Sequence, residues 1–240
     1  MSEPARIDRT LATLDENLAL DEALLLAAEA GEAGESLRFW EWPAPAVVLG
    51  AGGSVEIDVN EAACRADEVP VHRRASGGGT VLLGPGCLLF SLVLSYERAK
   101  ALGDVTASYR WILGRVREAL RPLAVEHVGI SDLAVGGLKV SGNAQQRKAR
   151  HVLHHGTLLY AFDLPQVGRY LNVPEREPGY RAGRPHEAFV TNLPAPAGDM
   201  KEQITAVFGA GPGDADERVL RRVPGLIAEK YGRAEWVRRR

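Results

Sequence analysis

The chain has 240 residues, 45% of them hydrophobic and 25% charged, a balance typical of a globular protein that buries a sizeable core and not of a disordered chain. Its formal net charge of -2 excludes a general electrostatic attraction to nucleic acid or to an anionic membrane, so neither is an expected partner. The two cysteines exclude a disulfide framework, and no segment has the character of a signal peptide or of an apolar span of about 20 residues, so we expect a cytoplasmic protein.

A helix and several strands are expected in the first half of the chain. Thr13 and Glu16 have the spacing of a capping box, and apolar residues then recur on one helical face up to the next glycine pair. Asp21 falls on that apolar face, which predicts a hydrogen-bonded partner and no catalytic role. The extended segments 37–42 and Ala46–Leu49 are expected to be neighbouring strands. They are followed by a short helix over 60–66, a strand over 69–74, a glycine loop and an apolar strand over Cys87–Ser95.

The second half is expected to contain an amphipathic helix and a β-hairpin. Apolar residues at helical spacing run over 105–120, and Pro122 ends the pattern. The dipeptide at 136–137 is Gly-Gly, which tolerates the positive φ angles of a two-residue turn between strands 132–135 and 138–140. Further along, we expect a strand over 152–160, a helix over 164–171, a Pro-rich irregular stretch over 173–198 and a charged C-terminal helix.

This succession of elements predicts the fold class and the domain organisation. Strand pairs joined by short turns, with a few long helices between them, indicate an α+β fold and not a regular βαβ alternation. We expect one catalytic domain over residues 1–195. A short C-terminal extension over residues 196–240 would pack on that domain or trail from it.

The first candidate site is the glycine loop over residues 73–80, RRASGGGT. Its three consecutive glycines let backbone N–H groups approach an anion closely, Arg74 can pair with a phosphate, and Ser76 can donate a further hydrogen bond. The pattern lacks the Gly-Lys-Ser/Thr end of a Walker loop and the spaced glycines of a dinucleotide fingerprint. The residues alone therefore leave two interpretations open, an anion-binding loop or an ordinary turn.

Lys139 is the second candidate. It is expected just beyond the hairpin turn, where the strand fixes its backbone, and Ser141, Gly142 and Asn143 beside it supply small polar groups and room for a ligand. In that position it could hold a carboxylate and a phosphate together. The alternative is an exposed lysine at a polar strand edge, which is the more usual place for this residue.

The third candidate is the pair His154-His155, which precedes Gly156 and Thr157. Strand alternation sends the two imidazoles to opposite faces, so they are not expected to bind one metal ion, and no metal site is predicted. One imidazole is expected either in the core, with a hydrogen-bonded partner, or in the wall of a pocket. Cys87 opens an apolar strand and is expected to be a buried, inert thiol and not a nucleophile.

Taken together, three segments resemble the lipoate-protein ligase family in order and spacing: RRASGGGTV at 73–81, SDLAVGGLKVSGNAQQRK at 131–148 and HHGTLLY at 154–160. With YLN at 170–172 and VTNL at 190–193, the resemblance covers nearly all of residues 13–193. It implies the mixed, mostly antiparallel sheet flanked by helices that this family shares with biotin ligases and class II aminoacyl-tRNA synthetases. It also implies a two-step reaction, in which lipoate or octanoate attacks the α-phosphate of ATP to give acyl-AMP and an acceptor lysine then takes the acyl group.

The resemblance also implies the roles of individual residues. Arg74 and residues 79–82 match the nucleotide-binding loop of the family, and Lys139 matches the catalytic lysine that contacts both the carboxyl oxygen and the phosphate. ATP and lipoate or octanoate are the expected co-substrates, and magnesium is expected with ATP, with no protein ligands assigned. The substrate- and nucleotide-binding residues expected on this basis are Arg74, Ser76, Gly77, Gly78, Gly79, Thr80, Val81, Leu82, Lys139, Ser141, Gly142, Asn143, His155, Gly156 and Thr157.

Two departures from the family pattern modify these expectations. Where many members have His-Asp after the glycine strand, this chain has Leu83-Gly84-Pro85, so a polar contributor to nucleotide or metal binding is missing there. Only a short stretch follows Leu193, where complete ligases carry a small C-terminal domain or use a separate protein. The expected partners are therefore lipoyl-domain acceptors, namely dehydrogenase E2 subunits and the glycine cleavage H protein, with a small accessory protein as a further candidate.

Three alternatives stay open. A related octanoyltransferase takes its acyl group from acyl carrier protein through a cysteine thioester and without ATP; residues 125–132 hold no cysteine, which leaves Cys87 as the candidate thiol. A biotin ligase is disfavoured, because RRASGGG stands in place of its Gly-Arg-Gly-Arg-type loop. A non-catalytic partner- or lipoyl-binding relative belongs to a different class, and Lys139 argues against it.

Overall fold

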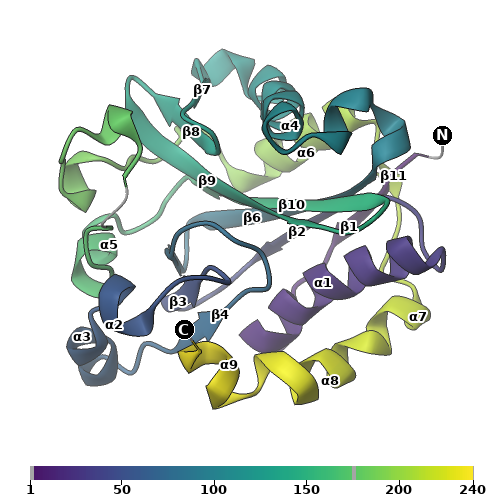
Figure 1. Ribbon diagram of the computed structural model, residues 1–240. Coiled ribbons are helices and arrows are strands. Elements are labelled where there is room, and N and C mark those ends of the chain that lie inside the picture. The colour runs from purple at the N-terminus through teal and green to yellow at the C-terminus, as the bar shows by residue number, and fades with distance from the viewer. Residues whose placement is uncertain (1–2, 175–176, 240) are drawn as a thin grey trace.

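A large mixed β-sheet forms the centre of the computed structural model, which describes residues 3–174 and 177–239 (Figure 1). Its strands are β1 (Ala5–Asp8), β2 (Ser36–Glu41), β6 (Cys87–Ser95), β7 (Glu126–Val128), β8 (Asp132–Val135), β9 (Leu138–Arg147), β10 (His151–Leu159) and β11 (Gly211–Pro212). Within the described ranges these eight strands have the order β11-β1-β2-β6-β10-β9-β8-β7, and β1 runs parallel to its neighbours β2 and β11. The remaining pairs are antiparallel, so the expected α+β fold with a mixed, mostly antiparallel sheet is confirmed.

A second, smaller sheet corrects one expectation about strand pairing. It contains β3 (Ala46–Leu49) between β4 (Val71–Arg73) and β5 (Val81–Leu83). The expectation that β2 and β3 are neighbours is therefore wrong, because β2 pairs with β1 and β6 in the large sheet. Pro43 and Pro45 lie between them, and because proline cannot donate a ladder hydrogen bond, the chain leaves the large sheet there. The glycine loop joins β4 to β5, a strand that the sequence analysis did not separate from the loop.

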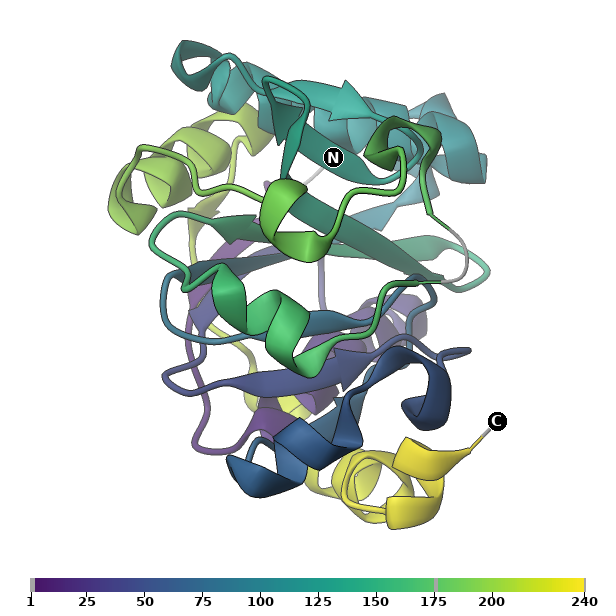
Figure 2. The ribbon, with the colours of Figure 1, turned by 90° about the vertical axis from the view of Figure 1, so that its left-hand side faces the viewer.

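Helices cover both faces of the large sheet (Figure 1). On one face α4 (Val105–Ala119) packs against α6 (Ala197–Phe208), and on the other α1 (Leu14–Ala30) packs against α7 (Glu217–Leu220) and α8 (Arg222–Leu226). The helices α2 (Val55–Asp58), α3 (Glu61–Ala66) and α5 (Pro165–Tyr170) gather at one end of the molecule, which faces the viewer in Figure 2, and α9 (Ala234–Arg238) packs on β4. The C-terminal region thus forms several short helices where one was expected. None of the helices in the described ranges is long and apolar enough to cross a membrane.

The large sheet separates two hydrophobic cores. Along β6, Leu88, Phe90 and Leu92 point into the core under α4, whereas Leu89 and Val93 point into the core under α1 and the small sheet. This alternation is the two-residue period of a strand that is buried on both faces. Full burial of each such side chain contributes about 1.5–3 kcal/mol to the free energy of folding.

The N-terminal helix begins and ends as the sequence predicts. The Thr13 side chain accepts a hydrogen bond from the Glu16 N–H, the Glu16 carboxylate accepts one from the Thr13 N–H, and Gly31 ends the helix with a φ of 74°. Asp21 has the expected partners: its carboxylate accepts hydrogen bonds from Arg38 Nη1 and Ser91 Oγ, each at 2.6 Å. Helix α1 is thereby tied through its buried face to two strands of the large sheet.

Candidate active site

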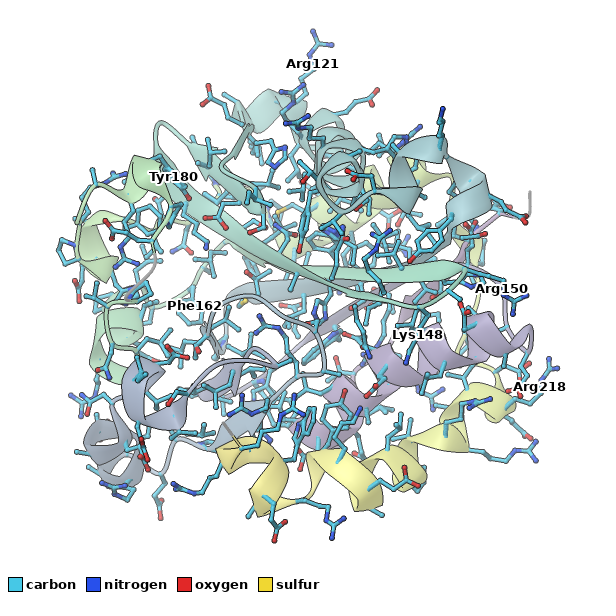
Figure 3. All side chains as sticks on the ribbon, in the orientation of Figure 1. Arg121, Lys148, Arg150, Phe162, Tyr180 and Arg218 are labelled. Carbon is cyan, nitrogen blue, oxygen red and sulfur yellow. The ribbon has the colours of Figure 1, made fainter. Side chains whose placement is uncertain are left out.

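Two pockets meet between the large sheet, the small sheet and α1. The inner pocket is narrow, about 120 Å³, and its apolar wall is formed by Leu18, Trp40, Val48, Leu83, Leu89 and Phe90. The outer pocket is wider, about 600 Å³, and extends toward α5 and the segment 178–190. Phe162, in the wall of the outer pocket, and Tyr180, beside it, mark this region at the left of Figure 3. The residues that line both pockets, here called the junction, are Gly79, Thr80, Val81, Ser131, Asp132, Lys139, Gly142 and Thr157.

Lys139 lies at this junction, and its backbone is held from both sides. It follows the turn formed by Gly136 and Gly137, whose φ angles of 56° and 76° confirm the predicted hairpin. Its N–H donates to the Phe189 carbonyl at 2.8 Å, and its carbonyl accepts from the Thr191 N–H at 2.9 Å. The backbone of Lys139 is thus fixed, and its side chain, 27% exposed, forms part of the wall of both pockets instead of an exposed strand edge.

The Lys139 ammonium is paired with Asp132, a residue that sequence reasoning did not select. Lys139 Nζ lies 2.9 Å from Asp132 Oδ1, and the Tyr180 hydroxyl donates to the other carboxylate oxygen at 2.9 Å. The two residues lie on opposite sides of a bulge in β9, where Leu133 pairs with Ser141 whereas Ala134 already pairs with Lys139. The hairpin turn was visible in the sequence and would have placed Asp132 near Lys139, but the extra residue in β9 was not.

Arg74 is the cation of the glycine loop, and it is buried without a carboxylate partner in the described residues. It donates to Ser76 Oγ at 3.0 Å and to the carbonyls of Val48, Gly77 and Gly79 at 3.3, 2.7 and 2.8 Å. These contacts use four of its five N–H groups. Among the described residues the fifth N–H has no hydrogen-bond partner, so it can donate to a ligand. Burial lowers the pKa of Arg74 to about 10, so the guanidinium stays charged at neutral pH. An uncompensated positive charge in a pocket wall favours an anionic ligand.

The two neighbouring histidines point to opposite faces, as predicted. His155 faces the inner pocket, with Nε2 at 2.5 Å from Ser76 Oγ and Nδ1 at 3.6 Å from Asp21 Oδ2. His154 lies in the core under α4, where Nε2 donates to Asn143 Oδ1 and Nδ1 accepts from the Gln145 side chain, both at 3.2 Å. His154 is thus the structural member of the pair and His155 the pocket member.

Because His154 is buried and neutral, we expect the protein to lose stability at mildly acidic pH. Burial, and next the nearby His155 and His127, lower the pKa of His154 from 6.5 to about 3. Between these values the unfolded chain binds a proton that the folded chain does not, so stability decreases as the pH falls below 6.5. From pH 7 to pH 5 this group should cost about 2 kcal/mol, at about 1.4 kcal/mol per pH unit. Urea unfolding of the wild type and of His154→Gln at both pH values checks this; an equal pH dependence of the two proteins would contradict it.

Asp21, His155 and Ser76 lie in a row, but the row does not supply a nucleophile. Ser76 is buried, its hydroxyl lies between Arg74 and His155, and it is absent from the wall of either pocket. Burial opposes the ionisation of Asp21, yet the charge of Arg38 and the contacts to His155 and Ser91 outweigh it, and the pKa of Asp21 lies below its usual value. The ionised Asp21 therefore orients His155 in the wall of the inner pocket.

Neither cysteine forms part of the wall of the two pockets. Cys87 is fully buried, and burial, with a smaller effect from Glu41, raises its pKa to about 12. Cys64 in α3 is also buried, and its pKa is raised mainly by burial. Neither thiol is placed to accept an acyl group from a ligand at the junction. In residues 3–174 and 177–239 there is also no group of three or more His, Cys, Asp or Glu side chains that could hold a metal ion.

Most of the residues selected from the sequence lie in the pocket walls, and the exceptions have evident structural roles. Ser76 and Gly77 lie behind the wall, where both accept hydrogen bonds from Arg74. Gly156 lines the inner pocket, and a Cβ there would lie 1.9 Å from Asn143 Oδ1, so glycine makes room for that side chain. Sequence reasoning missed Asp132 and Trp40 as wall residues and gave Asp21 only its structural role. The positions found in a wall are Arg74, Gly78, Gly79, Thr80, Val81, Leu82, Lys139, Ser141, Gly142, Asn143, His155, Gly156 and Thr157.

Comparison with protein families and curated proteins finds one family and relatives of two kinds. Residues 13–208 match the family model described as lipoyl protein ligase A/B catalytic domain. The protein named octanoyltransferase LipM of Symbiobacterium thermophilum is 30% identical over 257 residues, which cover 92% of this chain and 93% of that relative. Lipoate-protein ligase 1 of Staphylococcus aureus is 32% identical over 161 residues, which cover 65% of this chain and 46% of that relative. The relatives thus carry two different activity names.

Comparison with solved structures confirms the fold. A structure described as a bi-partite lipoate protein ligase and its E2 lipoyl domain from Thermoplasma acidophilum has a TM-score of 0.84 at 21% identity, covering 99% of this chain and 96% of that chain. A lipoate-protein ligase A bound with ATP has a TM-score of 0.83 at 22% identity, covering 98% of both chains. At such identities these similarities establish a shared fold and nothing about the substrates of this chain.

Proposed function

Because the chain belongs to the family of lipoyl protein ligase A/B catalytic domains, we propose that it is an ATP-dependent lipoate-protein ligase. It activates lipoate or octanoate as acyl-AMP and transfers the acyl group to a lysine of a lipoyl domain. The observation that carries this proposal is the position of Lys139 at the junction of a narrow, largely apolar pocket and a wider one. A cation at that point can hold the carboxylate of an acyl chain and the α-phosphate of a nucleotide together.

The first step joins two anions, which is the difficulty that Lys139 addresses. A carboxylate oxygen forms a bond to the α-phosphorus, the bond from that phosphorus to the bridging oxygen breaks, and pyrophosphate leaves. Two like charges about 4 Å apart repel by about 1 kcal/mol in water and about 4 kcal/mol near a protein surface. A fixed ammonium between the two groups offsets this repulsion, and it stabilises the negative charge that develops during transfer.

The second step transfers the acyl group to the acceptor. The neutral amine of the acceptor lysine attacks the acyl carbon, a C–N bond forms, the C–O bond to the phosphate breaks, and AMP leaves with the electron pair. The proton lost from the nitrogen passes to solvent. Lys139 is placed to stabilise the departing phosphate in this step too, because it faces the same junction.

The two pockets divide the substrates between them. The inner pocket takes the acyl chain along Leu18, Trp40 and Leu89, and the outer pocket takes the nucleotide, whose phosphates lie against the glycine loop. Among the described residues that line both pockets, Asp132 is the one with a carboxylate side chain. Magnesium would therefore be held mainly by phosphate and water oxygens with Asp132 nearby, which is an arrangement that this ion accepts.

The proposed protein substrates are lipoyl domains, namely dehydrogenase E2 subunits and the glycine cleavage H protein, in the cytoplasm. Support comes from the Thermoplasma acidophilum structure, which is described as a ligase with its E2 lipoyl domain and aligns with 99% of this chain. The same structure is described as bi-partite, which supports a small accessory protein as a further partner.

A second candidate function is octanoyl transfer without ATP. It is favoured by the relative named octanoyltransferase LipM, which aligns with 92% of this chain. A route through a cysteine thioester is disfavoured by the two buried thiols, because Cys87 has a pKa of about 12 and lines neither pocket. The ligase is therefore the function that the arrangement of the site supports best.

The experiment that tests the proposal is acylation of an apo lipoyl domain, read by intact mass. One mixture contains the chain, ATP, magnesium and lipoate, and the other contains octanoyl acyl carrier protein without ATP. We expect a lipoyl mass increase that requires ATP, and Cys87→Ala should keep the wild-type rate because this thiol does not face the site.

The outcomes separate the alternatives. An octanoyl mass increase without ATP, abolished in Cys87→Ala, would replace the ligase by the transferase. If neither mixture gives an increase, thermal unfolding with ATP and lipoate distinguishes two cases: stabilisation by both ligands indicates a ligase that needs its partner, whereas no stabilisation contradicts the proposal.

A further inference from the structure

Arg73, the neighbour of Arg74 in the glycine loop motif, has an unusual set of partners for a buried cation. Its side chain is 1% exposed, and no carboxylate in the described residues lies within ion-pair distance. Its guanidinium makes six hydrogen bonds, all to backbone carbonyl oxygens. A buried charge needs such compensation, so these carbonyls fix the position of Arg73 and Arg73 fixes theirs.

The carbonyls come from two segments that are far apart in the sequence. Arg73 Nη1 donates to Gly50, Ala51 and Gly53 in the loop after β3, at 3.0, 3.3 and 2.7 Å. Its Nε and Nη2 donate to Val237 at 3.1 and 2.7 Å, and Nη2 also donates to Arg239 at 2.9 Å. The last carbonyls of a helix have no partner within that helix, so the end of α9 supplies free acceptors to Arg73.

Trp236 on α9 donates a hydrogen bond back to Arg73. Its indole Nε1–H donates to the Arg73 carbonyl at 2.9 Å, so that α9 both accepts from and donates to the same residue. The indole ring is held in turn by the guanidinium of Arg239, which lies 3.6 Å from the ring centroid. In Figure 1 helix α9 lies near β4, where the glycine loop begins.

The segment that carries Trp236 is anchored to the body of the protein. It includes a π-helical turn, Ile227–Tyr231, and both of its last two residues bind the buried Glu22 of α1. Lys230 Nζ lies 2.7 Å from each Glu22 oxygen, and the Tyr231 hydroxyl donates to Glu22 at 2.7 Å. Helix α9 therefore contacts the start of the glycine loop from a segment that is itself fixed to α1.

We propose that the C-terminal segment 227–239 is a positioning element of the active site, and that Trp236 is a positioning residue that holds the glycine loop in its ligand-binding shape through Arg73. Arg73 and Arg74 are consecutive, so that one points outward to α9 while the other points into the inner pocket. A shift of the Arg73 backbone thus moves Arg74 and the loop glycines. This segment lies beyond the residues matched by the family model, 13–208. The loop's role in nucleotide binding rests on the proposed function.

The test compares Trp236→Phe and Trp236→Ala with the wild type. Phenylalanine keeps the ring and removes the N–H donor, and alanine removes both. We expect the KM for ATP to rise about threefold to tenfold in Trp236→Phe, the fold-change that corresponds to one lost hydrogen bond, with kcat changed less than twofold. Hydrogen exchange in the peptide covering residues 75–80 should be faster in both variants than in the wild type, and fastest in Trp236→Ala.

Arg222→Ala is the matched control. It removes the contact of Arg222 Nη2 with Glu32 at 2.7 Å, which ties the same C-terminal region to the segment just after α1, away from the loop. We expect Arg222→Ala to have the wild-type KM for ATP and wild-type exchange in residues 75–80. Wild-type KM and exchange in folded Trp236→Phe and Trp236→Ala would overturn the inference. If the wild type neither makes acyl-AMP nor is stabilised by ATP and lipoate, the proposed function fails, and the exchange comparison still decides whether the segment positions the loop.

Discussion

Lys139→Ala is expected to reduce kcat/KM for acyl-AMP formation by about 10³-fold, the range seen when one donor to a developing oxyanion is removed. The side chain lies where the two pockets meet, so its loss leaves the carboxylate and the phosphate without the cation between them. The fold should survive, because the side chain is 27% exposed and its backbone hydrogen bonds to Phe189 and Thr191 do not depend on it. The measurement is the rate of pyrophosphate release with lipoate and ATP, together with thermal unfolding.

Lys148→Ala is the control for a general loss of positive charge, since Lys148 follows the other end of the strand that carries Lys139. Lys148 is exposed and follows the last residue of β9, whereas Lys139 is near the start of that strand. Figure 3 shows Lys148 far from Tyr180, the residue that contacts Asp132 in the site. It should keep wild-type activity. A folded Lys139→Ala variant that turns over at the wild-type rate would contradict the role of Lys139 and with it the proposed function.

Local signals in the sequence were sufficient for elements whose geometry is set by neighbouring residues. The capping box at Thr13 is satisfied by a residue three positions away, and Gly136-Gly137 forms its turn without outside help. The pairing of β2 and β3 was predicted wrongly because the two strands are short and follow one another closely in the sequence. The sheet that β2 or β3 joins depends on its pairing with a distant strand, β6 for β2 and β4 for β3. The hydrophobic pattern of a strand does not specify its pairing partner.

The same distinction explains the candidate site. Arg74, Lys139 and His155 could be selected because each lies in a segment whose own composition suggests chemistry or resembles a family. The ion pair of Asp132 with Lys139 depends on how the two side chains are oriented across the hairpin, and the contact between Trp236 and Arg73 joins residues that no local pattern relates. Those features arise from packing between elements, which is why the C-terminal segment was expected only as an extension.

The close approach of two glycine segments gives the second large expected effect. Gly50, in the loop after β3, lies against Gly78 of the glycine loop, and a Cβ on Gly50 would lie 1.9 Å from the Gly78 carbonyl oxygen. Gly78 itself has a φ of +84° and lines the inner pocket beside Arg74. The crowding therefore falls directly on the pocket wall. Since contacts under 3.0 Å essentially do not occur for a Cβ, an alanine at position 50 must push the two loops apart by about 1 Å.

Gly50→Ala is therefore expected to lower kcat/KM for acyl-AMP formation by about 10²-fold, because a misplacement of about 1 Å in a site can cost that much. Gly52→Ala is the matched control, since a Cβ there meets nothing within 4 Å and its φ is not positive. It should keep full activity, with stability unchanged or raised by about 0.4–1 kcal/mol through a less flexible unfolded chain. Both variants are compared by pyrophosphate release and thermal unfolding. Equal activity in the two variants would show that the spacing between these loops does not set the shape of the site. A loss of activity confined to Gly50→Ala would show that Gly50 maintains the shape of the inner pocket through its contact with Gly78.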